Sequence, residues 1–256
     1  MAELVRSFRG AIKRIAPRFV INARRRWVLS RSIRRLDQEL VGKPTAEIFS
    51  EIYRRQLWGR PTSDRKFSSG HGSSMELHVG PYVAAVGEFL ASFPARPSVV
   101  DLGCGDFNVG SKIRQYFGNY IACDVAHAVL NENRIRYSGM DVEFRQLDMI
   151  NEPLPDGEVC IIRQVLQHLS NADILRVVQK LYKYQVLIIT EPVPRFKFLP
   201  NLDQPTGVSS RLARGIPSGV VLTEPPFSLR VAASKELCAT LDELSDARLV
   251  TTAFSF

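Results

Sequence analysis

The chain has 256 residues, of which 45% are hydrophobic and 23% are charged, the usual mixture for a globular protein. This composition excludes a disordered or collagen-like chain, and the longest apolar runs are far shorter than the ~20 residues that cross a bilayer. The four cysteines lie 19, 37 and 78 residues apart, a spacing that predicts free thiols and neither a zinc site nor a disulfide framework.

The net charge of +8 is concentrated at the N-terminus. Residues 1–36 carry eleven Arg or Lys and one acid, whereas the rest of the chain carries 23 basic and 25 acidic residues. Apolar residues recur here every three or four positions, which predicts a basic amphipathic helix. These positions are Leu4, Phe8, Ile12, Ile15 and Phe19. We therefore expect residues 1–43 to form a basic helical arm that contacts a membrane surface or a partner; a cleaved transit peptide and a helix packed on the body remain alternatives.

Residues 44–80 are predicted to form a cap, with a helix over 46–57 and a Gly/Ser-rich loop over 67–74. From residue 81 to residue 256, extended and helical segments alternate, which predicts one domain around a parallel sheet covered on both faces. Strands are expected at 98–102, 120–123, 142–147, 159–162, 185–190 and 248–254, and helices at 82–93, 172–182 and 236–244. Residues 191–230 contain seven prolines, which predicts an insertion or lid within this domain.

A glycine motif, Asp101-Leu-Gly103-Cys-Gly105, ends the first expected strand of this domain. Doubly wound sheets bind ligands at the carboxyl ends of their strands, and glycines there let the backbone approach a ligand closely. The motif does not continue as a dinucleotide fingerprint, because the third glycine would fall at Asn108.

Two further acids stand at the ends of the next two expected strands. Asp124 lies nineteen residues after Gly105, where a carboxylate can accept hydrogen bonds from both hydroxyls of a ribose. Asp148 ends the following strand, where it can accept a hydrogen bond from the exocyclic amine of adenine. This order of acid, glycines, acid and acid indicates a nucleoside that carries an amino acid and no pyrophosphate.

Together these elements resemble the cofactor motifs of the class I S-adenosylmethionine (SAM)-dependent methyltransferases over residues 81–190. The resemblance implies an α/β, Rossmann-like fold with a doubly wound, mostly parallel seven-stranded sheet. It also implies SAM as cofactor and S-adenosylhomocysteine (SAH) as product; an NAD enzyme or a non-catalytic scaffold of similar fold is the alternative. The residues expected at the cofactor are Asp101, Gly103, Gly105, Asp124, Val125, Asp148, Met149 and Arg163.

A narrower resemblance covers residues 44–230 and links the chain to bacterial methyltransferases associated with surface-polysaccharide synthesis. It is carried by Glu47-Ile-Phe49, by the loop Ser69-Gly-His71-Gly-Ser73 and by residues 163–171. This resemblance implies O-methylation of a sugar hydroxyl in a glycan acceptor. It suits a cytoplasmic protein whose basic arm rests on the cytoplasmic face of the inner membrane. The alternatives are an RNA or protein methyltransferase that holds its substrate with the arm, and a non-catalytic binding module.

Methylation of a hydroxyl is helped by a general base, because a neutral alcohol is a poor nucleophile. His168 is the first candidate, since it follows the fourth expected strand and histidine titrates near neutrality. Glu191, just after the fifth strand, and His71, in the Gly/Ser loop, are the other two candidates. Each of the three also has a purely structural interpretation, and the sequence leaves the choice open.

Arg163 is expected to pair with Glu191 or with an acidic group of the substrate. Gln164 and Gln167 stand where some ribose and catechol-type methyltransferases carry metal-binding glutamates. Hard divalent cations prefer charged oxygen ligands, so no metal is expected. A nucleic acid substrate is less favoured, because the Asn/Asp-Pro-Pro-aromatic motif of DNA amine methyltransferases is absent after the fourth strand.

Overall fold

The computed structural model describes residues 35–60, 65–213, 216–242 and 245–256. The amphipathic helix expected within residues 1–34 lies outside this part of the chain and stays a prediction. Residues 35–40 are helical, and Leu40 is buried. Among the described residues, no helix is long and apolar enough to cross a membrane.

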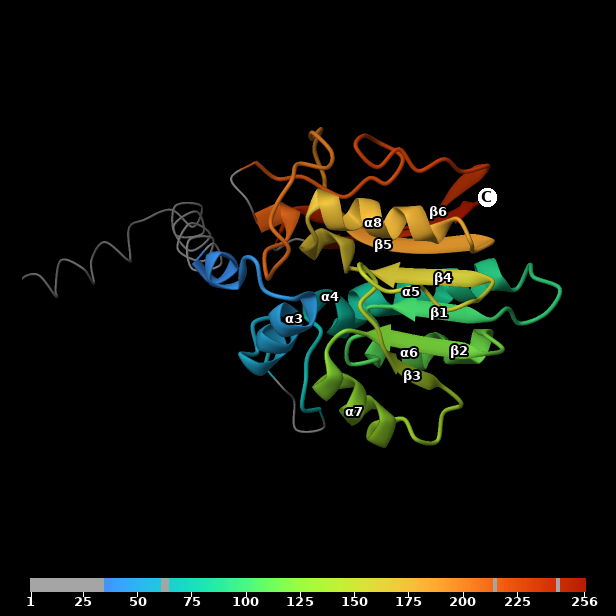
Figure 1. Ribbon diagram of the computed structural model, residues 1–256. Coiled ribbons are helices and arrows are strands. Elements are labelled where there is room, and N and C mark those ends of the chain that lie inside the picture. The colour runs from blue at the N-terminus through green and yellow to red at the C-terminus, as the bar shows by residue number, and fades with distance from the viewer. Residues whose placement is uncertain (1–34, 61–64, 214–215, 243–244) are drawn as a thin grey trace, which may run out of the picture.

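Seven strands form one sheet in the order β3-β2-β1-β4-β5-β7-β6 (Figure 1). The first five are parallel, and β7 pairs antiparallel with both β5 and β6. The expected mostly parallel seven-stranded sheet is confirmed. The strands are β1 (Val99–Leu102), β2 (Tyr120–Asp124), β3 (Glu143–Gln146), β4 (Val159–Arg163), β5 (Val186–Pro194), β6 (Ala233–Asp242) and β7 (Ala247–Ser255).

Helices cover both faces of the sheet, because successive side chains of each buried strand point to opposite faces. Val159 and Ile161 of β4 pack with α5 (Glu76–Leu90) and α6 (Asn108–Ile113), whereas Cys160 and Ile162 pack with α8 (Asn171–Leu181). Figure 1 shows α8 in front of the strands and α5 behind them. A further helix, α7 (His127–Arg136), follows β2 and packs beside β3.

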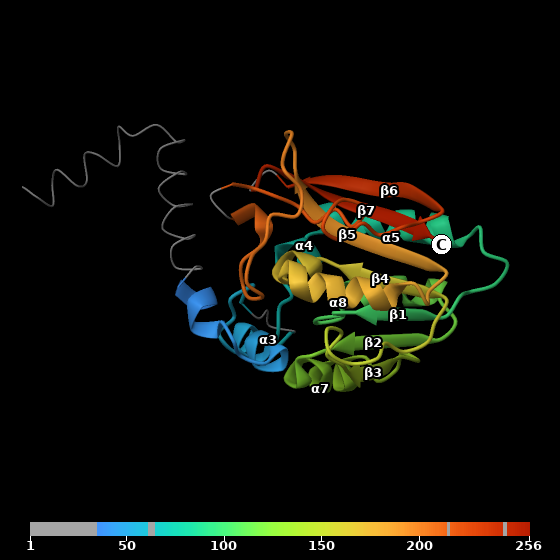
Figure 2. The same ribbon diagram turned by 45° about the horizontal axis from the view of Figure 1, so that its top comes forward.

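The cap lies at the carboxyl ends of the parallel strands (Figures 1 and 2). Its main helix, α3 (Thr45–Arg54), buries Ile48, Phe49 and Ile52 in the same core cluster as α8. The expected Gly/Ser loop contains one short helix, α4 (His71–Ser74), which leads directly into α5. The helix expected at 82–93 therefore begins earlier, at Glu76, and includes Pro81.

The helix expected at 236–244 is wrong, because these residues belong mostly to strand β6. The segment pairs antiparallel with β7, with an irregularity between Glu236 and Cys238. Strand β7 would otherwise present unpaired backbone groups at the edge of the sheet. Pairing with β6 satisfies these groups, so tertiary context overrides the local helical periodicity of residues 236–244.

The prolines predicted to mark an insertion are divided between two parts of the structure. Pro192 and Pro194 extend β5, and the chain then runs without a strand over the described residues from 195 to 232, called the connecting segment below. This segment is well packed: Asn201 is 5% exposed, and its side-chain amide binds the carbonyls of Val221 and Pro225. The connecting segment is thus positioned to form a wall of a site.

Candidate cofactor and acceptor site

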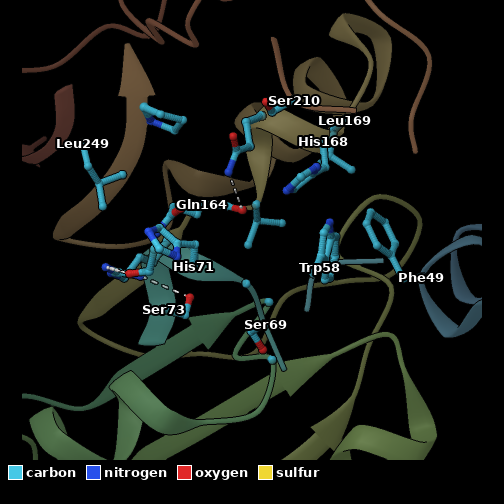
Figure 3. A pocket seen from close by; sticks show the side chains of 18 of the residues that line it. Phe49, Trp58, Ser69, His71, Ser73, Gln164, His168, Leu169, Ser210 and Leu249 are labelled. Carbon is cyan, nitrogen blue, oxygen red and sulfur yellow. Dashed lines mark hydrogen bonds between the residues drawn. The ribbon is translucent and has the colours of Figure 1, made fainter. Parts of the chain in front are cut away.

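A cavity of about 1070 Å³ opens at the carboxyl ends of β1, β2 and β4 beneath the cap. Strand order reverses between β1 and β4, and such a reversal is where doubly wound sheets bind ligands. We call the part formed by the ends of β1, β2 and β3 the cofactor side. The opposite part, which Figure 3 shows, is called the acceptor side; it is lined by Trp58, His71, Gln164, His168, Ser210 and Leu249.

The glycine motif forms a narrow turn on the cofactor side. Gly103 and Gly105 have φ of +78° and +54°, values that side chains rarely adopt. A Cβ on Gly103 would lie 2.4 Å from Cγ2 of Val165, and one on Gly105 would lie 2.3 Å from Oγ of Ser69. Val165 and Ser69 therefore pack directly on the backbone of this turn, at two positions where only glycine fits.

Asp124 holds this turn in place from the end of β2. Its side chain is buried, and Oδ2 accepts a hydrogen bond from the Gly105 N–H at 3.0 Å, while Oδ1 accepts one from the Ala126 N–H at 2.9 Å. Burial raises the pKa of Asp124. Each carboxylate oxygen has a second lone pair, so Asp124 can still accept hydrogen bonds from a ribose diol.

Asp101 and Asp148 complete the row of acids. Asp101 is buried and accepts a hydrogen bond from the Tyr120 hydroxyl at 2.8 Å; burial raises the pKa of this carboxyl to about 7. Asp148 is half-buried and accepts a hydrogen bond from the Ile150 N–H at 2.9 Å. All eight residues expected at the cofactor line this one cavity.

Arg163 binds the cap, although its expected partner was Glu191. Its guanidinium donates to the carbonyl of Gly72 at 2.8 Å and to Oγ of Ser73 at 3.3 Å, and lies 4.9 Å from the centre of the Tyr82 ring. These contacts correct the expected pairing with Glu191. Arg163 ties α4 to the end of β4 and so helps to close the cavity.

Glu191 is buried and binds the backbone of the turn after β4. Its Oε1 accepts from the N–H groups of Val165 (3.0 Å) and Leu166 (2.8 Å), and its Oε2 accepts from that of Gln167 (3.1 Å). Burial raises the pKa of Glu191 to about 8. Glu191 is absent from the residues that line the cavity, so its contacts favour the structural interpretation, which is to hold the turn that presents His168.

His168 lies on the acceptor side, where its ring packs against Trp58 with 4.9 Å between ring centres (Figure 3). Its Nδ1 lies 3.2 Å from the carbonyl oxygen of Ser209. Because a carbonyl oxygen only accepts, this contact places the hydrogen on Nδ1 and leaves the lone pair on Nε2. Burial lowers the pKa of His168 to about 4, so the ring is neutral near pH 7.

His71 stands across the cavity from His168, with Gln164 between them (Figure 3). It is exposed at the start of α4, and its ring centre lies 6.4 Å from that of His78. The structure thus brings both histidine candidates to one cavity, but with different environments. His168 is held by packing and a hydrogen bond, whereas His71 borders solvent.

Comparison with known proteins agrees with this geometry. A family model described as a methyltransferase domain matches residues 99–185, which contain the glycine turn, Asp124 and Asp148. No curated protein matched the chain in sequence. Among solved structures, the N-methyltransferase NodS from Bradyrhizobium japonicum in complex with SAH is 10% identical, with a TM-score of 0.58; the match covers 81% of this chain and 98% of NodS. Residues 99–185 thus match a methyltransferase domain, and the described chain shares the fold of NodS.

Two further structures show how far the similarity extends. A SAM-dependent methyltransferase from Leishmania major is 15% identical with a TM-score of 0.57, and the match covers 85% of this chain and 87% of that one. The match to a protein from Galdieria sulphuraria covers 46% of this chain and 48% of that chain, with 16% identity and a TM-score of 0.39. This chain thus spans about half the length of that protein.

The acceptor side also has residues that the sequence did not point to. Neither Trp58 nor Ser209 was assigned a role from the sequence. Gln164 has a φ of +57° at the end of β4, and its side-chain amide packs so closely on Gly72 that a Cβ there would lie 2.3 Å away. A residue in this conformation at the mouth of a site is a signal of function that becomes visible only in three dimensions.

Metal binding has no support within the described residues. No group of three or more His, Cys, Asp or Glu is placed there to hold an ion. The amides of Gln164 and Gln167 stand after β4, as the sequence indicated, and the Gln167 N–H is bound by Glu191. Independence from metal stays a prediction that a chelator would test.

Proposed function

We propose that this protein is a SAM-dependent methyltransferase that transfers the methyl group of SAM to a hydroxyl of a sugar in a surface polysaccharide or its precursor. The observation that carries the proposal is His168, a neutral imidazole at the cavity whose ring packs on Trp58 and whose Nδ1 is held by the Ser209 carbonyl. Bound SAM supplies an electrophilic methyl group on a positively charged sulfur. His168 would accept the proton of the acceptor hydroxyl on Nε2 as the hydroxyl oxygen takes the methyl group and SAH is released.

The cofactor side has the residues that would hold SAM. By the family resemblance, Asp124 would accept hydrogen bonds from the ribose, Asp148 would lie near adenine, and Asp101 with the two glycines would lie near the methionine part. The tight glycine turn and the place of these residues in the lining of one cavity support this assignment. Transfer in line requires close alignment of acceptor, methyl group and sulfur, and a fixed cofactor supplies half of that alignment.

The acceptor side has the mixed lining that a sugar needs. The ring of Trp58 and the side chains of Pro192 and Leu249 offer apolar surface for the C–H face of a sugar, and Gln164 and Ser210 lie among them with polar groups. A carbohydrate displays the same alternation of apolar faces and hydroxyls.

Two acids on the acceptor side disfavour a polyanionic substrate. Asp242 and Asp246 line the cavity, and Asp246 forms an ion pair with Arg195 at 3.4 Å. Carboxylates at this position would repel the phosphates of a nucleic acid. An RNA substrate would therefore have to rely on the basic arm, and its methylation is the competing outcome in the experiment below.

We further propose that the basic arm holds the methyltransferase at an anionic membrane surface where lipid-linked glycans are assembled. The support is the charge of residues 1–36, which carry eleven basic residues and one acid. Deletion of residues 1–34 should release the protein from vesicles of anionic phospholipid and leave its affinity for SAH unchanged. Unchanged vesicle binding after this deletion would reject the arm as an anchor.

The experiment that tests the reaction has two stages. Calorimetric titration of SAH should give binding in about the micromolar range, worth roughly 8 kcal/mol. Conversion of SAM to SAH should then be measured with neutral sugars, nucleotide-linked sugars, lipid-linked oligosaccharides, RNA and a protein extract as acceptors. Turnover with a glycan that stops in His168→Gln supports the proposal. Turnover with RNA or protein alone, or SAH binding without turnover on any acceptor, would contradict it.

A further inference from the structure

Asp37 is a buried residue whose carboxylate binds the connecting segment, about 170 residues further along the chain. It lies in the helical stretch 35–40, and its side chain is only 3% exposed. Oδ1 accepts hydrogen bonds from the backbone N–H groups of Val208 (2.9 Å) and Ser209 (3.2 Å), and Oδ2 accepts one from the Ser209 hydroxyl. A buried charge is costly unless such bonds satisfy it, so Asp37 fixes these two residues firmly.

Ser209 continues this contact to His168 through the other end of its backbone. Its carbonyl oxygen accepts hydrogen bonds from Nδ1 of His168 at 3.2 Å and from Nε2 of Gln204 at 3.1 Å. The N–H of Gly207 in turn donates to the backbone carbonyl of His168 at 2.9 Å. Residues 207–209 are therefore held between Asp37 on one side and His168 on the other.

There is little room for these residues to adjust. A Cβ on Gly207 would lie 2.5 Å from Oδ1 of Asp37, so the carboxylate packs directly against the backbone that it binds. Trp58 contacts the His168 ring, with 4.9 Å between ring centres. The Ser209 carbonyl therefore restricts both the position of the ring and the nitrogen that carries its hydrogen.

We propose that Asp37 is a positioning residue for methyl transfer, which acts through Ser209 to keep His168 in one orientation and in the tautomer with hydrogen on Nδ1. The inference rests on the proposed role of His168 as the general base. The required tautomer leaves the lone pair on Nε2, the nitrogen that would accept the hydroxyl proton. Replacement of the carboxylate by an amide puts a donor in place of Oδ2, which accepts from the Ser209 hydroxyl, and weakens the bonds from the Val208 and Ser209 amides, because bonds to a charged acceptor are the stronger ones. The Ser209 carbonyl then shifts, and the ring can exchange between tautomers.

The first test reads the tautomer directly and needs no acceptor substrate. Protonated and unprotonated ring nitrogens differ in ¹⁵N chemical shift, and the chain has four histidines, so the spectrum of the full-length protein is simple. Loss of signals in His168→Gln assigns those of His168. We expect one tautomer in the wild type, with Nδ1 protonated, and a mixture of tautomers in Asp37→Asn and Ser209→Ala.

A matched control lies two residues away on the same helical stretch. Glu39→Gln removes the same charge, but Glu39 is exposed and forms its ion pair with Arg55 at 3.1 Å. This variant should keep the wild-type spectrum and the wild-type rate. Asp37→Asn is nearly isosteric and Ser209→Ala removes a single hydroxyl, so these two variants test the inference even if Asp37→Ala does not fold.

The second test measures turnover on a glycan acceptor. Displacement of a catalytic group by about 1 Å can cost about 100-fold in rate, so we expect kcat of Asp37→Asn to fall about 10- to 100-fold with SAH affinity unchanged. An Asp37→Asn protein with the wild-type tautomer and the rate of Glu39→Gln would overturn the inference. A mixture of tautomers in Asp37→Asn, together with full activity in His168→Gln, would instead reject His168 as the general base but support the coupling between Asp37 and His168. Failure of the proposed function and failure of this inference are therefore distinguishable.

Discussion

The two sides of the cavity are built in different ways. On the cofactor side, three consecutive strand ends between residues 101 and 148 place acids beside a glycine turn, and Asp124 finds its partners in Gly105 and Ala126. On the acceptor side, contacts join residues distant in sequence, such as Trp58 with His168 and Asp37 with Ser209. The difference teaches that binding of SAM and reaction with an acceptor are physically separable, and a variant on one side should alter one of these properties.

The largest expected difference between an effect on kcat and an effect on SAH affinity comes from His168→Gln. Loss of a general base typically costs about 10²- to 10⁴-fold, so kcat on the glycan acceptor should fall by that range. Affinity for SAH should stay within about twofold by calorimetry, because His168 lies on the acceptor side. His71→Gln serves as the comparison: a larger loss of kcat there than in His168→Gln would transfer the role of base to His71.

The converse variant is Asp124→Ala on the cofactor side. A buried polar group left without its partner costs about 1–3 kcal/mol, so affinity for SAH should fall roughly 10- to 100-fold. The matched variant is Asp148→Ala, which removes the carboxylate at the end of the next strand. Because Asp148 is only half-buried, its removal should lower the affinity for SAH by a smaller factor. Equal losses in the two variants, or a larger one in Asp148→Ala, would contradict the assignment of the ribose to Asp124.

This contrast also explains how much the sequence predicted. The sequence predicted that the acids and glycines of the cofactor side lie together, because they follow buried strands whose parallel ends must meet at one edge. The same holds for β1 to β5 and for α8, where Ser170 caps the helix by accepting a hydrogen bond from the Asp173 N–H. In each case the determining residues are neighbours along the chain.

The acceptor side was predicted only in part, because its contacts depend on tertiary packing. His168 was recognised from its place after a strand, but its neutral state comes from burial and the hydrogen on Nδ1 from the Ser209 carbonyl, neither of which sequence spacing reveals. Glu191 was considered as a base, and only its three backbone partners show that it holds the turn. The error at β6 has the same origin, since β7 decides its conformation across the sheet.

Asp101 gives the cofactor side a dependence on pH near neutrality. Burial raises its pKa to about 7, so the carboxyl group is mostly protonated below that pH. A protonated carboxyl group pairs less well with the positively charged amino group of SAH. Affinity for SAH should therefore fall up to about tenfold per pH unit below 7 and level off above it. Calorimetry at about pH 6 and about pH 8 checks this; Asp101→Asn should give equal affinities at both values, and a wild type without any difference would reject the role of Asp101.

The effect of Asp101 on stability has the opposite dependence on pH: affinity for SAH rises with pH, whereas stability falls. The folded protein keeps a proton on Asp101 between the ordinary carboxyl range and about pH 7, whereas the unfolded chain has lost it. The folded state thus binds more protons in this window, and the contribution of Asp101 to the free energy of unfolding decreases as pH rises through it. Thermal unfolding of the SAH-free protein should show this slope, and Asp101→Asn should reduce it; the remainder comes from Glu191, whose pKa burial raises to about 8.

The smallest expected effect separates recognition of the acceptor from chemistry. Trp58→Phe keeps an aromatic ring beside His168 but reduces the apolar surface offered to a sugar. A weakened contact worth about 1 kcal/mol should raise KM for the glycan about fivefold, with a much smaller change in kcat and none in SAH affinity. Because Trp58 also packs on His168, a fall in kcat without a change in KM would show that its ring orients the base and leaves the sugar to other residues.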